Sequence, residues 1–469
     1  MLTFVLDPHL NTPLYQQLYH FVRREIETGR LATGERLPSK RKLSAHLNIS
    51  QNTVITAYEQ LVAEGYIYAE PKRGYFVSAF EAKLNQGPSQ KSPGPAPQKH
   101  HVEPAYTYDF KTNTVDALDF PFPLWAKISR EVLHNDDGKL LTAVEPQGYL
   151  PLRQEIADYV HRYRGVVCSP DQIVVGAGTE YLIGLIVQLL GRDKRFAVEN
   201  PNYNRVYKVI QMSGAEVELS TLDDSGVIPE SLETLGVDVL HLTPSHQFPL
   251  GIVMPVGRRM ALLKWAEAAP GRCLIEDDYD SEYRFSGRPI PALQGLDTAG
   301  RVIYLNTFTR SLAPSMRISY MILPPALMER YKKSFGFYSS TVPRFEQHTL
   351  YKFMAAGHFE RHLIRMRKLY KLRRSAILTA LKSLPLAPRL SIVGTQAGLH
   401  LLVSLNGATE EAMVKAAQAA NIRVYGLSEY CIRPAPALPK DVVILGYASF
   451  TPEEITQAIA KLGEAWRTL

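Results

Sequence analysis

One stretch of the chain cannot pack into a hydrophobic core, and it divides the sequence into separate folding units. Residues 85–101 read Asn-Gln-Gly-Pro-Ser-Gln-Lys-Ser-Pro-Gly-Pro-Ala-Pro-Gln-Lys-His-His and show no apolar periodicity. Segments of this composition form semi-extended, flexible tethers. The sequence therefore predicts a small unit over residues 1–78, a linker over residues 79–104 and a large unit over residues 105–469.

The bulk properties indicate a cytoplasmic protein. The chain has 469 residues, 45% of them hydrophobic, which is enough to bury two or more cores. It contains no apolar run of about eighteen residues, so we expect no membrane span. The N-terminus lacks the basic leader and the long apolar segment of a signal peptide. Three widely spaced cysteines give neither a disulfide framework nor a zinc spacing, which is typical of a reducing compartment.

The small unit has the pattern of a helix-turn-helix followed by a wing. Residues 13–29 carry apolar side chains at helical spacing, with Pro13 in the first turn. Ser39 begins a second helix, and Ser50 is suited to cap a third. Two alternating segments follow, joined by a turn that reads Pro-Lys-Arg. The formal net charge of +7 permits nucleic-acid binding without requiring it.

Three motifs of the small unit carry a resemblance to a known family. They are Leu-Pro-Ser-Lys-Arg-Lys-Leu at 37–43, Ser-Gln-Asn-Thr-Val-Ile-Thr-Ala-Tyr at 50–58, and Glu-Gly at 64–65. In this order they resemble the winged helix of GntR-type regulators. Gln51 departs from the family pattern, which usually has arginine there, and glutamine can read adenine in the major groove. The resemblance implies that double-stranded DNA is contacted by Arg41, Ser50, Gln51, Asn52, Thr53, Arg73 and Gly74.

A second interpretation applies to each basic run taken alone. Residues 40–42, Lys-Arg-Lys, could be a solvated helix face, and Lys72 with Arg73 could be a polar turn. The complete order of motifs favours DNA binding, because a recognition helix presents its N-terminal residues to base edges and phosphates.

The large unit alternates strands and helices, which is typical of a parallel sheet with crossover helices. The strand 172–175 leads through Gly-Ala-Gly-Thr into a helix. A helix N-terminus offers free N–H groups and a partial positive charge to a phosphate. Gly178 and Thr179 are the candidate donors, although such turns often only cap a helix.

Two further strand ends carry candidate ligand-binding side chains. After the strand that begins at residue 195, Tyr203 is placed to stack on a planar ring, or to be a core aromatic, and Arg205 could meet a ligand carboxylate. Residues 273–283 carry the densest acidic cluster. A buried carboxylate there needs a partner, and a protonated pyridine nitrogen would serve. A solvated turn is the alternative, and no histidine spacing favours a metal, so we expect no metal site.

The segment 302–318 reads Val-Ile-Tyr-Leu-Asn-Thr-Phe-Thr-Arg-Ser-Leu-Ala-Pro-Ser-Met-Arg-Ile and predicts an anion cradle. A short apolar strand ends in Thr307 and Thr309, with Arg310 and Arg317 following. Hydroxyl and guanidinium donors make strong bonds to phosphate oxygens. The segment resembles the lysine-bearing turn of fold-type I aminotransferases, in which the lysine holds pyridoxal phosphate as a Schiff base. Arg310 stands at that lysine position.

The whole large unit resembles the same fold. The segments Thr-Pro-Ser-His-Gln-Phe-Pro at 243–249, Ile-Glu-Asp-Asp-Tyr-Asp-Ser-Glu-Tyr at 275–283 and Gly-His-Phe-Glu-Arg-His-Leu-Ile-Arg-Met-Arg at 357–367 are similar to motifs of the MocR subfamily of GntR-type regulators. We therefore expect a multidomain chain, with an N-terminal winged helix-turn-helix and an α/β fold-type I aminotransferase-like domain that binds an effector and dimerises.

The resemblance also implies roles for individual residues. Asp277 would pair with the pyridine nitrogen, although Asp278 competes for that role, and Tyr279 would bond the ring hydroxyl. Tyr203 would stack on the ring. The phosphate would be held by Thr179, Thr307, Thr309 and Arg317. Leu250 replaces a common threonine, and the family's C-terminal carboxylate arginine has only Arg423 and Arg433 as candidates.

Arg310 decides between the functional hypotheses. A guanidinium stays protonated, so it can neither form the Schiff base nor serve as the general base of transamination. We predict a homodimeric DNA-binding transcription regulator without catalytic residues that senses a small molecule such as an amino acid or a vitamer. The ligand is pyridoxal phosphate held non-covalently, pyridoxamine phosphate, a preformed cofactor–amino acid adduct or another anion. The alternatives are an aminotransferase with a DNA-binding appendage and a ligand-blind dimeric regulator.

Overall fold

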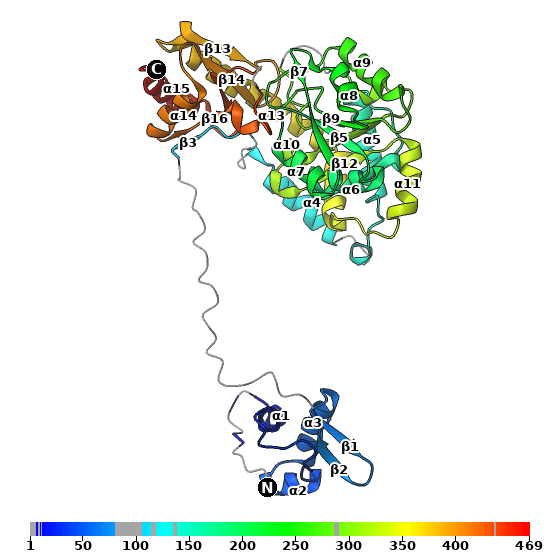
Figure 1. The fold of residues 1–469 in the computed structure, drawn as a ribbon. Coiled ribbons are helices and arrows are strands. Elements are labelled where there is room, and N and C mark those ends of the chain that lie inside the picture. The colour runs from blue at the N-terminus through cyan, green and yellow to red at the C-terminus, as the bar shows by residue number, and fades with distance from the viewer. Residues whose placement is uncertain are drawn as a thin grey trace. The chain divides into compact units, whose positions relative to one another are not determined.

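The chain forms two units, residues Met1–Pro104 and Ala105–Leu469 (Figure 1). The computed structural model describes residues 6–7, 10, 12–79, 106–112, 114, 119–134, 138–285, 290–435 and 438–469. Apart from Ala79, the predicted linker of residues 79–104 lies outside the described residues. Each unit is considered by itself below.

The N-terminal unit contains three helices, α1 (Leu14–Glu27), α2 (Lys40–Leu47) and α3 (Gln51–Ala63). The side chain of Ser39 accepts a hydrogen bond from the backbone N–H of Lys42 and caps α2, and Ser50 caps α3 through the N–H of Thr53. These serines satisfy N–H groups that have no partner inside the helix. One apolar face of each helix packs into a single core that includes Leu18, Leu43, Val54 and Tyr58.

Two short strands complete this unit, β1 (Ile67–Glu70) and β2 (Gly74–Val77). They pair antiparallel, from Ile67 opposite Val77 to Glu70 opposite Gly74. Gly74 has a φ of +119°, a conformation that side chains with a Cβ rarely adopt. Val62, which follows the buried Leu61 in α3, is 38% exposed because it lies at the edge of the buried face of that helix.

The C-terminal unit is built on a seven-stranded sheet in the order β4, β12, β11, β10, β9, β5, β6. The strands are β4 (Ile173–Gly176), β5 (Arg195–Glu199), β6 (Glu216–Ser220), β9 (Val239–Leu242), β10 (Cys273–Asp277), β11 (Val302–Thr307) and β12 (Ser319–Ile322). Only β12 runs antiparallel to its neighbours. The prediction of a mainly parallel sheet is therefore confirmed.

Helices cover both faces of this sheet, as the alternation of side chains along its strands requires. In β12, Tyr320 and Ile322 pack with one group of helices, whereas Met321 between them packs with the other. The helices that share the cores beside this sheet are α4 (Phe122–His134), α5 (Leu150–Arg164), α6 (Thr179–Leu190), α7 (Asn204–Met212), α8 (Pro229–Leu235), α9 (Val256–Glu267), α11 (Pro325–Phe335) and α12 (Arg344–Ala355). Strands buried on both faces explain the nearly continuous apolar runs of the sequence.

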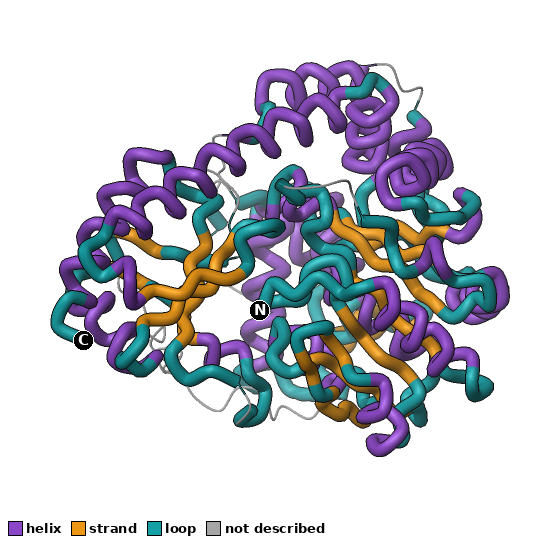
Figure 2. Tube along the Cα trace, turned by 90° about the horizontal axis from the view of Figure 1, so that it is seen from above, coloured by secondary structure: helices purple, strands orange, loops and turns teal. Residues whose placement is uncertain are grey.

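A second sheet has the order β13, β14, β17, β16 and is antiparallel. In Figure 2 the strands of the two sheets form separate groups bordered by helices. The remaining elements are β3 (Tyr108–Asp109), β7 (Leu222–Asp223), β8 (Gly226–Val227), α10 (Phe308–Ser311), α13 (His358–Ser383), β13 (Leu390–Val393), β14 (His400–Leu405), α14 (Glu410–Ala419), β15 (Ile422–Arg423), β16 (Tyr425–Gly426), β17 (Val442–Gly446) and α15 (Pro452–Trp466). Strand β3 pairs parallel with β15, so the start of this unit joins its C-terminal part.

The described ranges contain no candidate membrane span and no candidate metal site. None of their helices combines the length and apolar character that a bilayer crossing needs. No cluster of three or more His, Cys, Asp or Glu side chains within them is arranged to hold a metal ion.

Candidate functional site

A cavity of about 470 Å³ lies where the parallel strands of the large sheet end. Asp277 and Thr307 are the last residues of β10 and β11, and both line the cavity. Thr243 lies just beyond β9, and Thr179 begins α6 after β4. Ligands of open α/β sheets bind at the carboxyl ends of the strands, and the volume suits a small molecule. The cavity is therefore the candidate site of this unit.

The floor of the cavity carries a buried carboxylate with a free acceptor. The Oδ2 atom of Asp277 lies 3.4 Å from Nε2 of His241, and its Oδ1 atom has no hydrogen-bond partner among the described residues. Both ring nitrogens of His241 also lack a hydrogen bond there. A buried carboxylate oxygen without a partner is costly, so this pair is prepared to receive a donor from a ligand.

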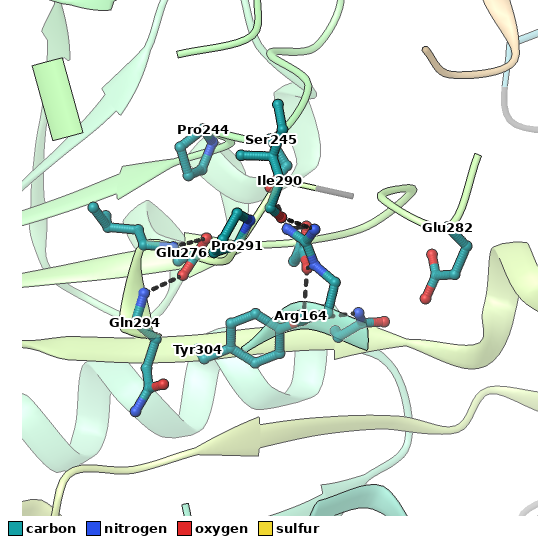
Figure 3. Close-up of polar contacts among 12 residues, drawn as sticks. Arg164, Pro244, Ser245, Glu276, Glu282, Ile290, Pro291, Gln294 and Tyr304 are labelled. Carbon is teal, nitrogen blue, oxygen red and sulfur yellow. Dashed lines mark hydrogen bonds and ion pairs between the residues drawn. The ribbon is translucent and has the colours of Figure 1, made fainter. Parts of the chain in front are cut away.

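Asp278 is held differently from its neighbour. Its Oδ2 accepts from Nε of Arg164 at 2.7 Å and from the hydroxyl of Tyr304 at 2.6 Å. Arg164 also donates to Ser245 and to the carbonyl of Ile290 (Figure 3). The structure thus places Asp277 in the cavity and ties Asp278 into a buried cluster beneath it.

The same cluster contains two buried glutamates, Glu276 and Glu282, whose pKa values are raised. Burial and the nearby charge of Asp278 raise the pKa of Glu276 to about 7. Its two carboxylate oxygens accept from the backbone N–H groups of Leu293 and Gln294 (Figure 3). Burial and Asp278 also raise the pKa of Glu282 to about 7.

Aromatic side chains form the walls of the cavity. Tyr203 lies half-buried before α7, with its ring edge-on to Phe248 at 6.1 Å between centroids. The hydroxyl of Tyr279 lies 3.1 Å from Nδ1 of His246. Burial, with the carboxylate of Asp280, raises the pKa of Tyr279 well above its usual value, so the phenol remains protonated. These rings could border a flat ligand, as the sequence predicts for Tyr203.

Hydroxyl groups cluster at one edge of the cavity. The Thr307 hydroxyl donates to Thr309 Oγ1 at 2.7 Å and accepts from Ser319 at 2.8 Å. Gly178 does not line the cavity, but a Cβ there would lie 2.3 Å from Nη2 of Arg317. Glycine at this position therefore leaves space for the Arg317 side chain, which lines the same cavity as Thr307 and Thr309.

One carboxylate is shared by two cations of the cavity. The Oε2 atom of Glu180 lies 2.7 Å from Nη2 of Arg317, and its Oε1 atom lies 3.3 Å from Nη1 of Arg205. Burial raises the pKa of Glu180, but the hydrogen bond and charge of Arg317 outweigh it, and the net shift is downward. The sequence did not single out Glu180, although it directly follows Thr179.

Arg310, in the short helix α10, lines the cavity. Its Nη1 donates to the carbonyl oxygen of Thr112 at 2.9 Å, and its guanidinium lies 5.5 Å from the ring centroid of Tyr279. Its own carbonyl accepts from the hydroxyl of Tyr283 at 3.0 Å. The side chain at the lysine position is therefore held by backbone and aromatic contacts inside the site.

The structure adds residues that sequence patterns did not reveal. Asn202 lies 1% exposed at the cavity, and its Nδ2 has no hydrogen-bond partner in the described part of the chain. Lys111 also lines the cavity. It reaches the site only because β3 pairs with β15, which no local signal indicates. The predicted candidates Arg423 and Arg433 do not line the cavity, so among the described residues its lining includes neither candidate for the family's C-terminal arginine.

A second candidate site is the exposed face of the N-terminal unit. Arg41 projects from α2, and Gln51 and Asn52 are exposed in the first turn of α3. The side chains of Ser50 and Thr53 are bonded to each other at 2.9 Å as part of the cap. Because α3 begins with these polar residues, its N-terminal end is suited to meet bases and phosphates.

The turn between β1 and β2 carries the basic tip that the sequence predicts. Arg73 is 72% exposed at its side chain and pairs with Glu70 at 2.5 Å. Its guanidinium lies 5.7 Å from the ring centroid of Phe76. Both contacts lie beside Gly74 at the start of β2, so the tip presents a cation on an ordered hairpin.

Comparisons with known proteins agree with both units. Residues 14–77 match the family of bacterial regulatory proteins, gntR family, and residues 108–462 match aminotransferase class I and II. The chain is 39% identical to the uncharacterized HTH-type transcriptional regulator YhdI of Bacillus subtilis (strain 168), covering 100% of this chain and 99% of the relative. It is 33% identical to the probable rhizopine catabolism regulatory protein MocR of Rhizobium meliloti, covering 99% and 96%.

A solved structure shows the same architecture for the large unit. The multiple substrate aminotransferase from Thermococcus profundus superposes with a TM-score of 0.67 at 25% identity, covering 78% of this chain and 93% of that enzyme. The predicted fold class, a winged helix-turn-helix with a fold-type I aminotransferase-like domain, is confirmed. The chain therefore belongs to the MocR-type family of transcriptional regulators, in which a GntR helix-turn-helix is fused to a class I and II aminotransferase domain.

Proposed function

We propose that this regulator is a cytoplasmic homodimer that senses a pyridoxal-phosphate-type ligand non-covalently through residues 105–469, the effector-binding and dimerisation domain. Residues 1–78 bind the DNA operator, and residues 79–104 connect the two. The observation that carries the proposal is the pairing of an intact ligand site with Arg310. The cavity keeps an acceptor, aromatic walls and an anion cradle, yet a guanidinium stands where a covalent bond would form.

The donor set fits a phosphorylated pyridine. The Oδ1 atom of Asp277, which has no partner among the described residues, would accept a hydrogen bond from a protonated ring nitrogen, because an ionised carboxylate is a hydrogen-bond acceptor. Tyr203 would stack on the ring, and the hydroxyl of Tyr279 would bond the ring's phenolic oxygen. The phosphate would lie against Thr179, Thr307, Thr309 and Arg317, where hydroxyls, a guanidinium and the start of α6 converge, and Gly178 would leave the room that Arg317 needs.

Position 310 argues against turnover. Bound pyridoxal phosphate supplies an aldehyde and an electron-accepting ring, but the chain must supply the amine and the proton-moving base. Arg310 can do neither, since a guanidinium provides neither the nucleophilic amine nor a general base in proteins. It can only orient a ligand by charge and by its place over Tyr279. We therefore assign no catalytic residue, and Arg205, a largely exposed lining residue of the cavity, would bind an effector carboxylate.

The DNA-binding arm rests on the exposed polar residues of the N-terminal unit. Gln51 and Asn52 would contact base edges, and Arg41, Ser50 and Thr53 would contact the adjoining backbone. Arg73 and Gly74 would place the wing tip against the duplex. Phosphate contacts position the protein, whereas contacts with base edges give sequence preference.

The test is an absorbance titration of the full-length protein with pyridoxal phosphate, beside Arg310→Lys and the surface control Arg389→Lys. We expect a saturable spectral change in the wild type that borohydride does not fix to the protein. Arg310→Lys should instead yield a borohydride-fixed phosphopyridoxyl group at position 310, and Arg389→Lys should behave as the wild type. Binding by Arg310→Lys alone would refute the proposal. Unchanged operator affinity on saturation would support the ligand-blind alternative.

A further inference from the structure

We infer that one exposed face of α13 is a second DNA-binding surface, which holds the phosphate backbone of a duplex without reading its sequence. This surface consists of Arg361, Arg365, Lys368 and Lys371 and is called the α13 basic face below. It belongs to the C-terminal unit, and none of its four residues lines the ligand cavity. The inference therefore goes beyond the proposed function, which places DNA binding in the N-terminal unit alone.

The spacing of the four residues gathers them on one side of the helix. They are separated by four, three and three positions, and side chains three or four positions apart are neighbours on a helix surface. The other side of α13 is apolar and buried, and it packs into the cores of the unit through Phe359, Leu363 and Tyr370. The four cations are exposed. Burial of the apolar side thus fixes the orientation of the helix and leaves the α13 basic face outside the core.

The α13 basic face lacks the acidic neighbours that would neutralise it. No Asp or Glu stands three or four positions from any of its four residues. At that spacing the neighbours are other cations, and like charges there repel one another. Other helices of the chain pair an exposed cation with an acid four positions away, as in Arg23–Glu27, Lys127–Glu131 and Lys415–Glu411. An external anion would relieve the repulsion along α13.

The existing contacts of the four side chains leave their charge uncompensated. Among the described residues, Lys368 and Lys371 have neither an ion pair nor a side-chain hydrogen bond. The contacts of Arg361 and Arg365 are with backbone carbonyl oxygens and histidine nitrogens, which carry no negative charge. All four groups can therefore engage phosphates, the guanidinium groups as planar forks and the ammonium groups as point charges.

The length of the α13 basic face suits a DNA backbone. Lys371 follows Arg361 by ten positions, which is about 15 Å along a helix that rises about 1.5 Å per residue. A duplex carries one phosphate charge per about 1.7 Å of its axis, so 15 Å of duplex offers about nine phosphates. Contacts of this kind carry no sequence information. The face would hold DNA that the winged helix has selected, at the raised effective concentration that a tether provides.

Two aliphatic side chains on the same face raise the alternative of an anionic lipid surface. Ile364 is 53% exposed and Leu372 is 61% exposed, and they stand four positions before and after Lys368. A helix that lies in a membrane interface buries a large apolar face there. The apolar side of α13 is already buried in the protein. The charge pattern therefore favours duplex DNA, and the N-terminal unit of the same chain matches a family of bacterial regulatory proteins.

Fluorescence anisotropy of the full-length protein with a long random-sequence duplex, over a series of salt concentrations, tests this surface. The variants are Lys368→Gln/Lys371→Gln and the charge-conserving Lys368→Arg/Lys371→Arg. The matched control, Lys332→Gln/Lys333→Gln, removes the same number of charges from exposed positions of α11 in the same unit. Arg73→Gln reports the contribution of the N-terminal unit. Sedimentation checks that all the proteins have the same oligomeric state.

We expect Lys368→Gln/Lys371→Gln to bind the duplex with a weaker salt dependence than the wild type. The slope of log K against log salt should be smaller by about 1.8 for each protomer in contact, since each lost phosphate contact removes about 0.9. Lys368→Arg/Lys371→Arg and the α11 control should keep the wild-type slope. An unchanged slope in Lys368→Gln/Lys371→Gln, or an equal reduction in the α11 control, would refute the second surface.

Further outcomes separate this inference from DNA binding by the N-terminal unit. A smaller slope in Arg73→Gln together with a wild-type slope in Lys368→Gln/Lys371→Gln would confine DNA contacts to the winged helix and overturn the inference alone. Failure of the wild type to bind the duplex would refute DNA binding by the chain as well. If only binding to phosphatidylglycerol vesicles were lost in Lys368→Gln/Lys371→Gln, the face would belong to a lipid surface and the inference would be wrong.

Discussion

Two neighbouring aspartates, Asp277 and Asp278, have different environments in the structure. Successive side chains of a strand point to opposite faces, so Asp277 and Asp278 at the end of β10 cannot share one environment. Asp277 faces the cavity with one unpartnered oxygen. Asp278 is fully buried against Arg164 and Tyr304. The sequence presented them as competitors for one role, and the pleat places them in different environments.

Replacing each aspartate by asparagine should have different effects. Asp277→Asn should weaken binding of pyridoxal phosphate by about tenfold or more, since a neutral amide is a poorer partner for a pyridinium. Asp278→Asn should lower the free energy of unfolding by about 3–5 kcal/mol, because Arg164 would remain buried without its counter-charge. Absorbance titration and urea unfolding measure the two effects. A stability loss for Asp277→Asn equal to that of Asp278→Asn would contradict this division.

Glu199 should make the C-terminal unit less stable as the pH rises toward neutrality. It is fully buried, and burial raises its pKa from 4.5 to about 7. A raised carboxyl pKa stabilises the fold below the unfolded pKa, and that stabilisation is lost as the pH rises through the folded pKa. The contribution is about 3 kcal/mol between pH 4.5 and 7.

Urea unfolding at a series of pH values checks this, followed by tryptophan fluorescence, since all three tryptophans lie in α4, α9 and α15 of that unit. Glu199→Gln keeps an acceptor for the Thr243 hydroxyl and should flatten the pH dependence relative to the wild type. Parallel curves for the two proteins would show that Glu199 does not titrate in this range.

At the scale of an element, the recognition helix α3 depends on a single side chain for its start. The Ser50 hydroxyl accepts from the N–H of Thr53, and its removal should cost about 1 kcal/mol. In Ser50→Ala, amide hydrogen exchange of residues 51–63 should therefore accelerate about fivefold. Thr409→Ala removes the equivalent cap of α14 and should accelerate exchange in that helix alone. Unchanged exchange of α3 in Ser50→Ala would contradict the role of the cap.

Elements were predictable where their signals are local. The Ser39 and Ser50 caps, the apolar strands that end in Asp277 and Thr307, and the turn before Thr179 are all visible within a few residues. Lys111 was not predictable as a cavity residue. Its place depends on the pairing of Tyr108 with Ile422, far along the chain. The Arg164–Asp278 contact likewise joins α5 to β10 across the sheet, and sequence spacing carries no information about such contacts.

At the scale of the whole molecule, the proposed dimer predicts both mass and DNA geometry. Sedimentation should give twice the chain mass of 52.6 kDa. Because two winged helices would then act together, a duplex with two half-sites should bind far more tightly than one with a single half-site. Gln51→Ala should relax base preference, whereas Arg73→Gln should weaken all sequences alike. A monomer mass with equal affinity for both duplexes would contradict the dimer.

The Glu180 carboxylate bridges Arg205 and Arg317, so these two cations already have a counter-ion that is covalently part of the protein. A phosphate that arrives there competes with a fixed carboxylate and releases few mobile ions, so its binding should depend only weakly on ionic strength. DNA binding through Arg41 and Arg73 of the N-terminal unit would instead release condensed counter-ions and weaken steeply with salt. A rise in salt should thus detach the protein from its operator while the ligand stays bound.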